Sequence, residues 1–362
     1  MPFFRQLCVA VAVSQAIAVC ADPQRGVTTY DDHVGLMHIR DAKGNSHPIR
    51  SQRDWHTRRR HILEGLQKVM GRLPDRSHQT ALDMRQVESI RIGKLTRKQI
   101  TYQTDRTGRV AAYLFLPEAT PQSTPGPAVL CLQQTNRVGK LEAAGIAGNP
   151  ELAHALHLAR RGYVTLAPDY PGFGESDYDF ASRHGYASGS MKAVWDNIRS
   201  VDLMLTLKQV DPTRIGVIGH SLGGHNAMFT AAFDNRLRVI VSNSGFTRFH
   251  KDDVPSWTGN RYMPLIQTRY GNDANRIPFD FPEIIGSFAP RPFLAIAPKR
   301  DRDFDYTGVL DSIDAARPVY RLFAATTSLQ AAYPDVKHSF PADSRARADK
   351  FLDTHLHHTP TK

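Results

Sequence analysis

Residues 214–233 read RIGVIGHSLGGHNAMFTAAF. The apolar run at 214–218 is typical of a buried strand, and residues 222–233 have helical spacing. Between them stands Gly219-His220-Ser221-Leu222-Gly223, a G-x-S-x-G pentapeptide. When a strand precedes this motif and a helix follows it, the serine sits on a tight turn with its hydroxyl exposed above the sheet. The stretch predicts that Ser221 is a nucleophile; the alternative is a glycine-rich turn of an ordinary doubly wound domain.

The rest of the chain alternates between strand and helix patterns. Such alternation predicts a mostly parallel central sheet with helices on both faces. Three earlier strand-like runs are expected to form its antiparallel edge at residues 87–92, 99–104 and 111–116. Buried-strand runs lie at residues 128–132, 163–167, 214–218, 239–242, 292–297 and 329–333, and helical patterns at 53–70, 152–161, 193–208, 222–233 and after Pro341.

A nucleophilic serine needs a base, and the base needs an acid to orient it. The expected chain order is serine, acid, histidine. His338 is the expected base, because it follows the last strand and the later histidines lie near the end of the chain. The acid is expected after the strand at 293–297, where Asp301 comes first and is favoured. The rival carboxylates in the same loop are Asp303 and Asp305.

The negative charge that develops on the substrate oxygen needs two backbone N–H donors. One is expected from Leu222, the residue after the nucleophile, and the other from the loop at residues 133–136. The second donor is left open between Gln134 and Thr135. His220 is expected to support the serine turn, and His225 to have a packing or surface role.

Further motifs carry a resemblance to a known family. They are CLQQT at 131–135, GKLE at 139–142, GNP at 148–150, APDYPGFG at 167–174 and APKRD at 297–301. With the Ser221 motif they resemble bacterial dienelactone hydrolases and acetyl-xylan-esterase-like enzymes of the α/β-hydrolase superfamily, over roughly residues 55–355. The resemblance implies the α/β-hydrolase fold and a serine esterase. Dienelactone hydrolases proper use a cysteine, so Ser221 favours ordinary carboxylic esters.

These observations predict a cofactor-free serine hydrolase that cleaves small-molecule or carbohydrate esters through an acyl-enzyme intermediate. One alternative is a serine peptidase of the prolyl oligopeptidase type. Those peptidases usually carry a large N-terminal propeller, whereas only roughly 100 residues precede the hydrolase core here. The other alternative is a non-catalytic binding protein with a hydrolase fold.

The N-terminus has the pattern of an export signal. Arg5 precedes an apolar run at 7–19, and small residues follow at Ala18, Cys20 and Ala21. The run is too short to span a bilayer, so residues 1–21 are predicted to be a signal peptide of a secreted or periplasmic protein, with lipid anchoring at Cys20 as the weaker alternative. Residues 22–362 are expected to form one hydrolase domain, with an N-terminal extension at 22–126 and a small cap at 246–282.

The formal net charge of +11 does not predict nucleic-acid binding, because the basic residues are scattered and Arg58-Arg59-Arg60 is the only tight run. Beyond the predicted signal only Cys131 remains, so no internal disulfide is expected. The histidines lack the spacing of zinc ligands, and no metal site is expected. No membrane-spanning segment is expected in the mature chain.

Overall fold

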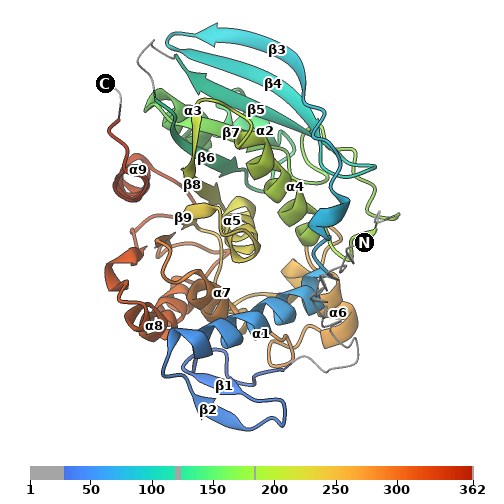
Figure 1. The fold of residues 1–362 in the computed structure, drawn as a ribbon, viewed down its shortest axis with the longest axis vertical. Coiled ribbons are helices and arrows are strands. Elements are labelled where there is room, and N and C mark those ends of the chain that lie inside the picture. The colour runs from blue at the N-terminus through green and yellow to red at the C-terminus, as the bar shows by residue number, and fades with distance from the viewer. Residues whose placement is uncertain (1–27, 119–123, 183–184, 361–362) are drawn as a thin grey trace, which may run out of the picture.

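A nine-stranded sheet forms the centre of the computed structural model, which describes residues 28–118, 124–182 and 185–360 (Figure 1). Its strand order is β11-β10-β9-β8-β6-β7-β5-β4-β3. The predicted signal peptide at 1–21 lies outside the described residues. The strands are β3 (Arg85–Ile92), β4 (Leu95–Gln103), β5 (Arg109–Pro117), β6 (Gly126–Leu132), β7 (Val164–Pro168), β8 (Val210–His220), β9 (Leu237–Asn243), β10 (Phe293–Ile296) and β11 (Leu329–Ala332).

The pairing confirms the predicted mixture of parallel and antiparallel strands. Strands β7, β6, β8, β9, β10 and β11 pair in parallel, whereas β3, β4 and β5 form an antiparallel edge that joins the sheet through β7. That edge lies at one end of the molecule in Figure 1. The α/β-hydrolase fold expected from the sequence is confirmed.

The central strands are apolar without interruption because both of their faces are buried. Along β6, Leu130 belongs to the core on one side of the sheet, and Val129 and Cys131 belong to the core on the other side. Successive side chains of a strand point to opposite faces, so a strand covered on both sides reads as a continuous apolar run. This explains why the sequence pattern located these strands well.

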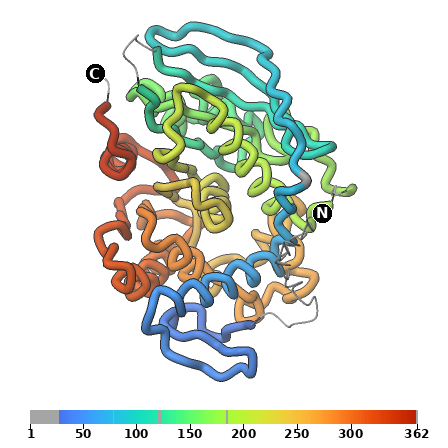
Figure 2. Tube along the Cα trace, in the orientation of Figure 1, coloured from blue at the N-terminus to red at the C-terminus, as the bar shows by residue number. Residues whose placement is uncertain are grey.

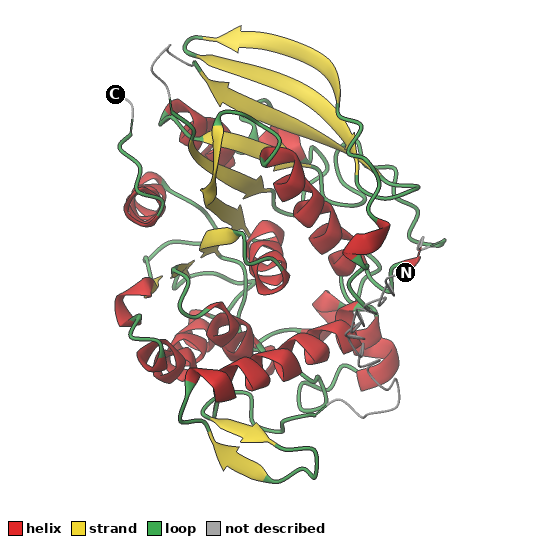
Figure 3. Cartoon of the chain, in the orientation of Figure 1, coloured by secondary structure: helices red, strands yellow, loops and turns green. Residues whose placement is uncertain are grey.

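Helices cover both faces of the sheet (Figure 3). One core contains residues of α1, α4, α5, α7 and α8, and the other contains residues of α3 and α9. Figure 2 shows the N-terminal α1 beside the much later α7, two elements that also contact one another. The helices are α1 (Gln52–Met70), α2 (Lys140–Ala143), α3 (His154–Arg160), α4 (Gly189–Met204), α5 (Leu222–Phe233), α6 (Leu265–Tyr270), α7 (Phe281–Phe288), α8 (Tyr306–Leu322) and α9 (Ala342–His355).

Several elements go beyond the sequence prediction. A two-stranded hairpin, β1 (His38–Arg40) and β2 (Ser46–Pro48), precedes α1, and the long helix α8 follows the loop that carries Asp301. Asp305 caps α8 by accepting a hydrogen bond from the Thr307 amide. An N-terminal cap of this kind is a signal that can be read in a sequence.

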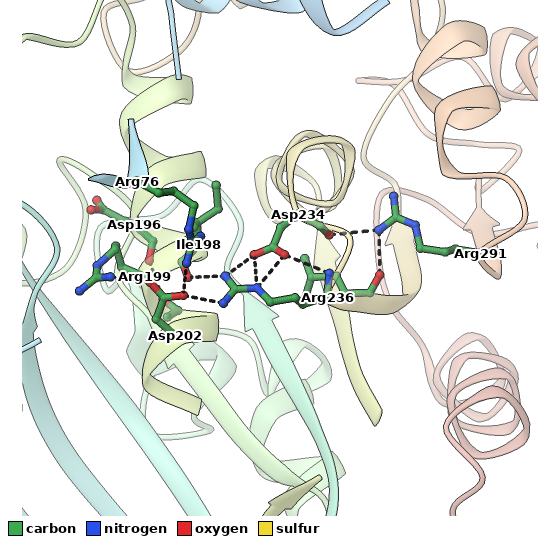
Figure 4. Close-up of polar contacts among 10 residues, drawn as sticks. Arg76, Asp196, Ile198, Arg199, Asp202, Asp234, Arg236 and Arg291 are labelled. Atoms are coloured by element: carbon green, nitrogen blue, oxygen red, sulfur yellow. Dashed lines mark hydrogen bonds and ion pairs between the residues drawn. The ribbon is translucent and has the colours of Figure 1, made fainter. Parts of the chain in front are cut away.

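A network of arginine and aspartate side chains connects α4 to the turn between α5 and β9 (Figure 4). The Asp202 carboxylate accepts hydrogen bonds from Arg76 at 2.7 Å and from Arg199 and Arg236 at 2.5 Å each. Arg236 also pairs with Asp234 at 2.6 Å. One carboxylate therefore holds three cations in place.

Among the described residues, no helix combines the length and apolar character needed to span a membrane.

Candidate active site

Ser221 occupies the sharp turn between β8 and α5. Its backbone has φ 54° and ψ −120°, a conformation that a residue with a side chain rarely adopts. The Ser221 amide donates a hydrogen bond of 3.0 Å to the carbonyl of Asn243, at the end of the neighbouring strand β9. The surrounding structure thus imposes a strained backbone on this serine, as it does at functional turns.

The glycines of the motif permit close approach of main chain to main chain. A Cβ on Gly219 would overlap the carbonyl of Gly223, and a Cβ on Gly223 would overlap the carbonyls of Leu132 and Gln133. Leu132 ends β6, so Gly223 allows the first turn of α5 to rest directly on the loop that follows β6. A larger residue at either glycine would therefore clash with the main chain, and these close contacts place the serine turn against the predicted oxyanion loop.

The loops after β10 and β11 bring Asp301 and His338 together. His338 Nδ1 lies 3.0 and 2.9 Å from the two carboxylate oxygens of Asp301. The Asp301 side chain is 1% exposed. Its Oδ1 also accepts hydrogen bonds from the backbone amides of Asp303 and Phe304, at 2.9 and 3.2 Å. The loop therefore wraps around this carboxylate and fixes its orientation.

The two rival aspartates are placed differently. Asp303 Oδ2 lies 3.5 Å from His338 Nδ1, and the Asp303 side chain is 65% exposed. Asp305 caps α8 through the Thr307 amide. Asp301 thus lies closer to His338 Nδ1 than Asp303 does, and Asp305 is engaged at the start of α8.

His220 contacts His338, and Asn243 contacts the loop that carries it. The ring of His220 lies 4.7 Å from the ring of His338, centroid to centroid. Asn243 Nδ2 donates to His220 Nδ1 at 2.6 Å and to the Ser339 carbonyl at 3.1 Å, so one amide group links the serine turn to the histidine loop. Burial and the neighbouring His338 lower the pKa of His220 well below its usual value, so His220 stays neutral.

Asn243 was not expected from the sequence. It lies opposite His220 only because of the register between β8 and β9, in which these two residues are paired. A single sequence carries no signal for such a register, other than a polar residue at the end of an apolar strand.

The predicted oxyanion donors border the serine turn. Within the described part of the chain, the backbone N–H groups of Leu222, Gln134 and Thr135 donate no hydrogen bond to another residue. The side chain of Thr135 is held by Tyr262, with 3.0 Å between the two hydroxyl oxygens. Both loop candidates stay open as the second donor.

A buried carboxylate shapes the oxyanion loop. Glu142 is 4% exposed and accepts hydrogen bonds from the Gln134 side chain at 3.2 Å and from the Asn136 side chain at 2.5 Å. It also accepts from the Asn149 amide at 3.0 Å. Glu142 thus holds the loop in place through hydrogen bonds. Glu142 belongs to the GKLE motif and Asn149 to the GNP motif, but the sequence alone does not show that the two motifs contact one another.

Aromatic side chains surround the first turn of α5 on the other side. His225 is 4% exposed, and its ring lies 4.7 Å from Trp257 and 6.4 Å from Tyr262. Burial lowers the pKa of His225 to about 3, so this histidine is neutral and its packing role is clear. Trp257 and Tyr262 belong to the segment 246–282, which therefore borders the site. Its designation as a cap stays a prediction, as do the other proposed domain boundaries.

An open cavity of about 640 Å³ lies beside the Asp301–His338 pair. It is lined by Arg300, Asp301, Arg302, Lys337 and His338. Within the described residues, Asp301, Asp303 and His338 also form a group whose ligand atoms lie within 4.8 Å of one another. A small cation would fit these three side chains. The hydrogen bonds that Asp301 accepts from His338 Nδ1, however, already explain why the two side chains lie together. The expectation of no metal stays a prediction.

Comparison with known proteins places this arrangement in a family. The model of the prolyl oligopeptidase family matches residues 151–358, which include Ser221, Asp301 and His338. The chain belongs to the prolyl oligopeptidase family. This membership and the sheet topology confirm the predicted relation to the α/β-hydrolase superfamily.

Several similar proteins are hydrolases or esterases by name. The chain is 27% identical to the "Putative hydrolase YtaP" of Bacillus subtilis over 261 residues, covering 65% of this chain and 79% of that protein. It is 25% identical to "4-O-methyl-glucuronoyl methylesterase 1" of Sodiomyces alcalophilus, covering 39% of this chain and 32% of that protein. A glucuronoyl esterase from Solibacter usitatus has a similar fold, with a TM-score of 0.70, 21% identity and coverage of 91% and 99% of the two chains.

Proposed function

We propose that this protein is a serine hydrolase of carboxylic esters, with Ser221 as nucleophile, His338 as base and Asp301 as orienting acid. The observation that carries the proposal is the strained Ser221 turn beside a histidine whose Nδ1 faces a buried carboxylate at 2.9 Å. That carboxylate keeps a proton on His338 Nδ1 and leaves Nε2 free to accept the serine proton. In the present structure, and within its described residues, Ser221 makes no hydrogen bond to His338; such contacts commonly tighten when substrate binds.

The reaction follows from these roles. Ser221 Oγ attacks the ester carbonyl while His338 takes its proton, and the carbonyl oxygen becomes negative. The N–H of Leu222 and one N–H of the 133–136 loop stabilise that oxygen. Leu222 is the first residue of α5, and a helix N-terminus favours negative charge. His338 then gives its proton to the leaving alcohol, and water releases the acyl group from Ser221 by the same route.

The names of the relatives support esters as the substrates. The methylesterase of Sodiomyces and the glucuronoyl esterase of Solibacter are both esterases, which favours a small-molecule or carbohydrate ester here. Membership of the prolyl oligopeptidase family supports a peptidase as the second candidate. In the described residues, however, the region before β6 forms a hairpin, a helix and three sheet strands, which is no propeller.

Substitution of the nucleophile tests the proposal. The Ser221→Ala variant should lose hydrolysis of 4-nitrophenyl acetate by roughly a thousandfold or more, because the triad acts as a unit. A matched control is Ser256→Ala, which changes an exposed serine in the segment 246–282. Near-normal turnover by a folded Ser221→Ala protein would refute the assignment. A wild-type preference for peptide 4-nitroanilides over esters would favour the peptidase instead.

We also propose that the protein is exported. The support is the pattern of residues 1–21, with its positive start, apolar run and small residues. Mass spectrometry of protein from the periplasm or medium should find a mature N-terminus near Asp22, or a lipid-modified Cys20. An intact N-terminus on protein confined to the cytoplasm would contradict export.

A further inference from the structure

Positive charge borders the cavity beside His338. Of the five residues that line this cavity of about 640 Å³, Arg300, Arg302 and Lys337 are cationic, and all three are exposed. They come from two different loops, after β10 and after β11, which are the loops that carry Asp301 and His338. The three cations therefore lie on the same two loops as the predicted acid and base.

The charges around the cavity are unequally neutralised. Arg300 pairs with Asp335 at 2.9 Å, and Asp301 is engaged by His338. Within the described part of the chain, the side chains of Arg302 and Lys337 have neither an ion pair nor a hydrogen bond. Two cations without an ion pair thus face the cavity, and the exposed Asp303 lies nearby, 3.5 Å from His338 Nδ1.

Unpaired cations beside a cavity attract and orient anions. A cleft lined by one sign of charge raises the local concentration of an oppositely charged substrate. Arginine in particular binds planar carboxylates with two parallel hydrogen bonds. Stability does not explain this arrangement, since two exposed cations on adjacent loops repel one another.

We propose that Arg302 and Lys337 bind a free carboxylate on the ester substrate, so that the enzyme prefers esters that carry a second, unesterified acid group. This inference rests on the proposed ester hydrolysis at Ser221. The carboxylate lies on either the acyl or the alcohol part of the substrate.

Two substrate pairs distinguish these sources. On the alcohol side, 4-acetoxybenzoate is compared with 4-acetoxybenzamide; on the acyl side, 4-nitrophenyl 4-carboxybenzoate is compared with 4-nitrophenyl 4-carbamoylbenzoate. Each pair differs in one charge, and the reporter is the ratio of kcat/KM for the anionic ester to that for the neutral ester. The double variant Arg302→Gln/Lys337→Gln removes both cations. The double variant Lys43→Gln/Lys350→Gln removes the same charge from exposed positions in the β1–β2 turn and on α9.

For at least one pair, the ratio should fall roughly tenfold in Arg302→Gln/Lys337→Gln, because each exposed ion pair changes binding by up to several-fold. The fall should appear mainly in KM, and raising NaCl from about 0.05 to about 0.5 M should lower the wild-type ratio by screening the cations. The control variant should keep the wild-type ratio. If neither ratio falls more than about twofold beyond the control, the cations do not select the substrate and this inference is wrong, while turnover of the neutral esters by the wild type still supports esterase function. Absence of turnover of all four esters would instead count against the proposed function itself.

Discussion

Replacing Asp301 by asparagine tests how the acid controls the base. The Asp301 carboxylate accepts two backbone N–H groups on Oδ1 and faces His338 Nδ1 with both oxygens. In the Asp301→Asn variant the amide oxygen can keep the two backbone bonds, and the amide NH2 then points at His338 Nδ1. Two donors cannot face each other, so His338 moves its proton to Nε2, where the serine proton has to go.

The magnitude follows from that tautomer change. We expect kcat to fall roughly ten-thousandfold, as it does when the triad aspartate of a serine protease is replaced by asparagine. A fall of that size corresponds to about 5.4 kcal/mol of transition-state free energy. The matched control is Asp303→Asn. Its carboxylate is 3.5 Å from His338 Nδ1 and 65% exposed, so solvent screens it and kcat should fall by less than about tenfold.

The assay is steady-state hydrolysis of 4-nitrophenyl acetate by both variants, with circular dichroism and thermal unfolding to show that each is folded. A larger loss in Asp303→Asn than in Asp301→Asn would show that Asp303 is the acid. Equal, small losses in both variants would refute the role of this loop in orienting His338.

Three further outcomes are expected. Asp202→Ala should lower the free energy of unfolding in urea by roughly 2–4 kcal/mol, because three arginines lose their shared partner. The control Asp314→Ala removes one partner of a surface ion pair, whose Asp314 side chain is 59% exposed, and should lower it by less than about 1 kcal/mol. Burial lowers the pKa of His225 to about 3, and the pKa returns to about 6.5 on unfolding, so the unfolded chain binds an extra proton and stability falls as the pH drops from 6.5 towards 4. Compared with the His225→Gln variant, the wild type should lose roughly 3 kcal/mol of its free energy of unfolding over that range. Parallel pH profiles of the two proteins would contradict this. EDTA should leave ester turnover unchanged, because the proposed reaction uses Asp301 and His338 and needs no metal. A loss restored by a divalent cation would show that the group with Asp303 is a metal site.

The sequence predicted the parts of this molecule that depend on local patterns. The buried strands were found because both of their faces pack, and the Ser221 turn because its glycines are required by close contacts with Leu132 and Gln133. The expected chain order of serine, acid and histidine singled out Asp301 and His338, two side chains that contact one another in the structure.

The remaining features depend on contacts between distant segments. The pairing of Asn243 with His220 follows from the register between β8 and β9. Glu142 binds Gln134, Asn136 and Asn149 because of the path of an irregular loop, which has no hydrophobic periodicity in the sequence. Helix α8 is a different case, because the Asp305 cap and the apolar spacing of Val309, Ile313 and Tyr320 were present in the sequence. The helix begins directly after the loop that carries the candidate acids, and its cap Asp305 is one of those candidates.

The most direct test of the account is covalent labelling of the nucleophile. The folded wild-type protein is treated with a fluorophosphonate until ester turnover stops, digested with trypsin and analysed by mass spectrometry. The account predicts one adduct, on Ser221 within the peptide of residues 215–236, at one equivalent per chain, and no adduct in the Ser221→Ala variant. Complete loss of turnover with the adduct on another residue, or full turnover with Ser221 modified, would contradict it.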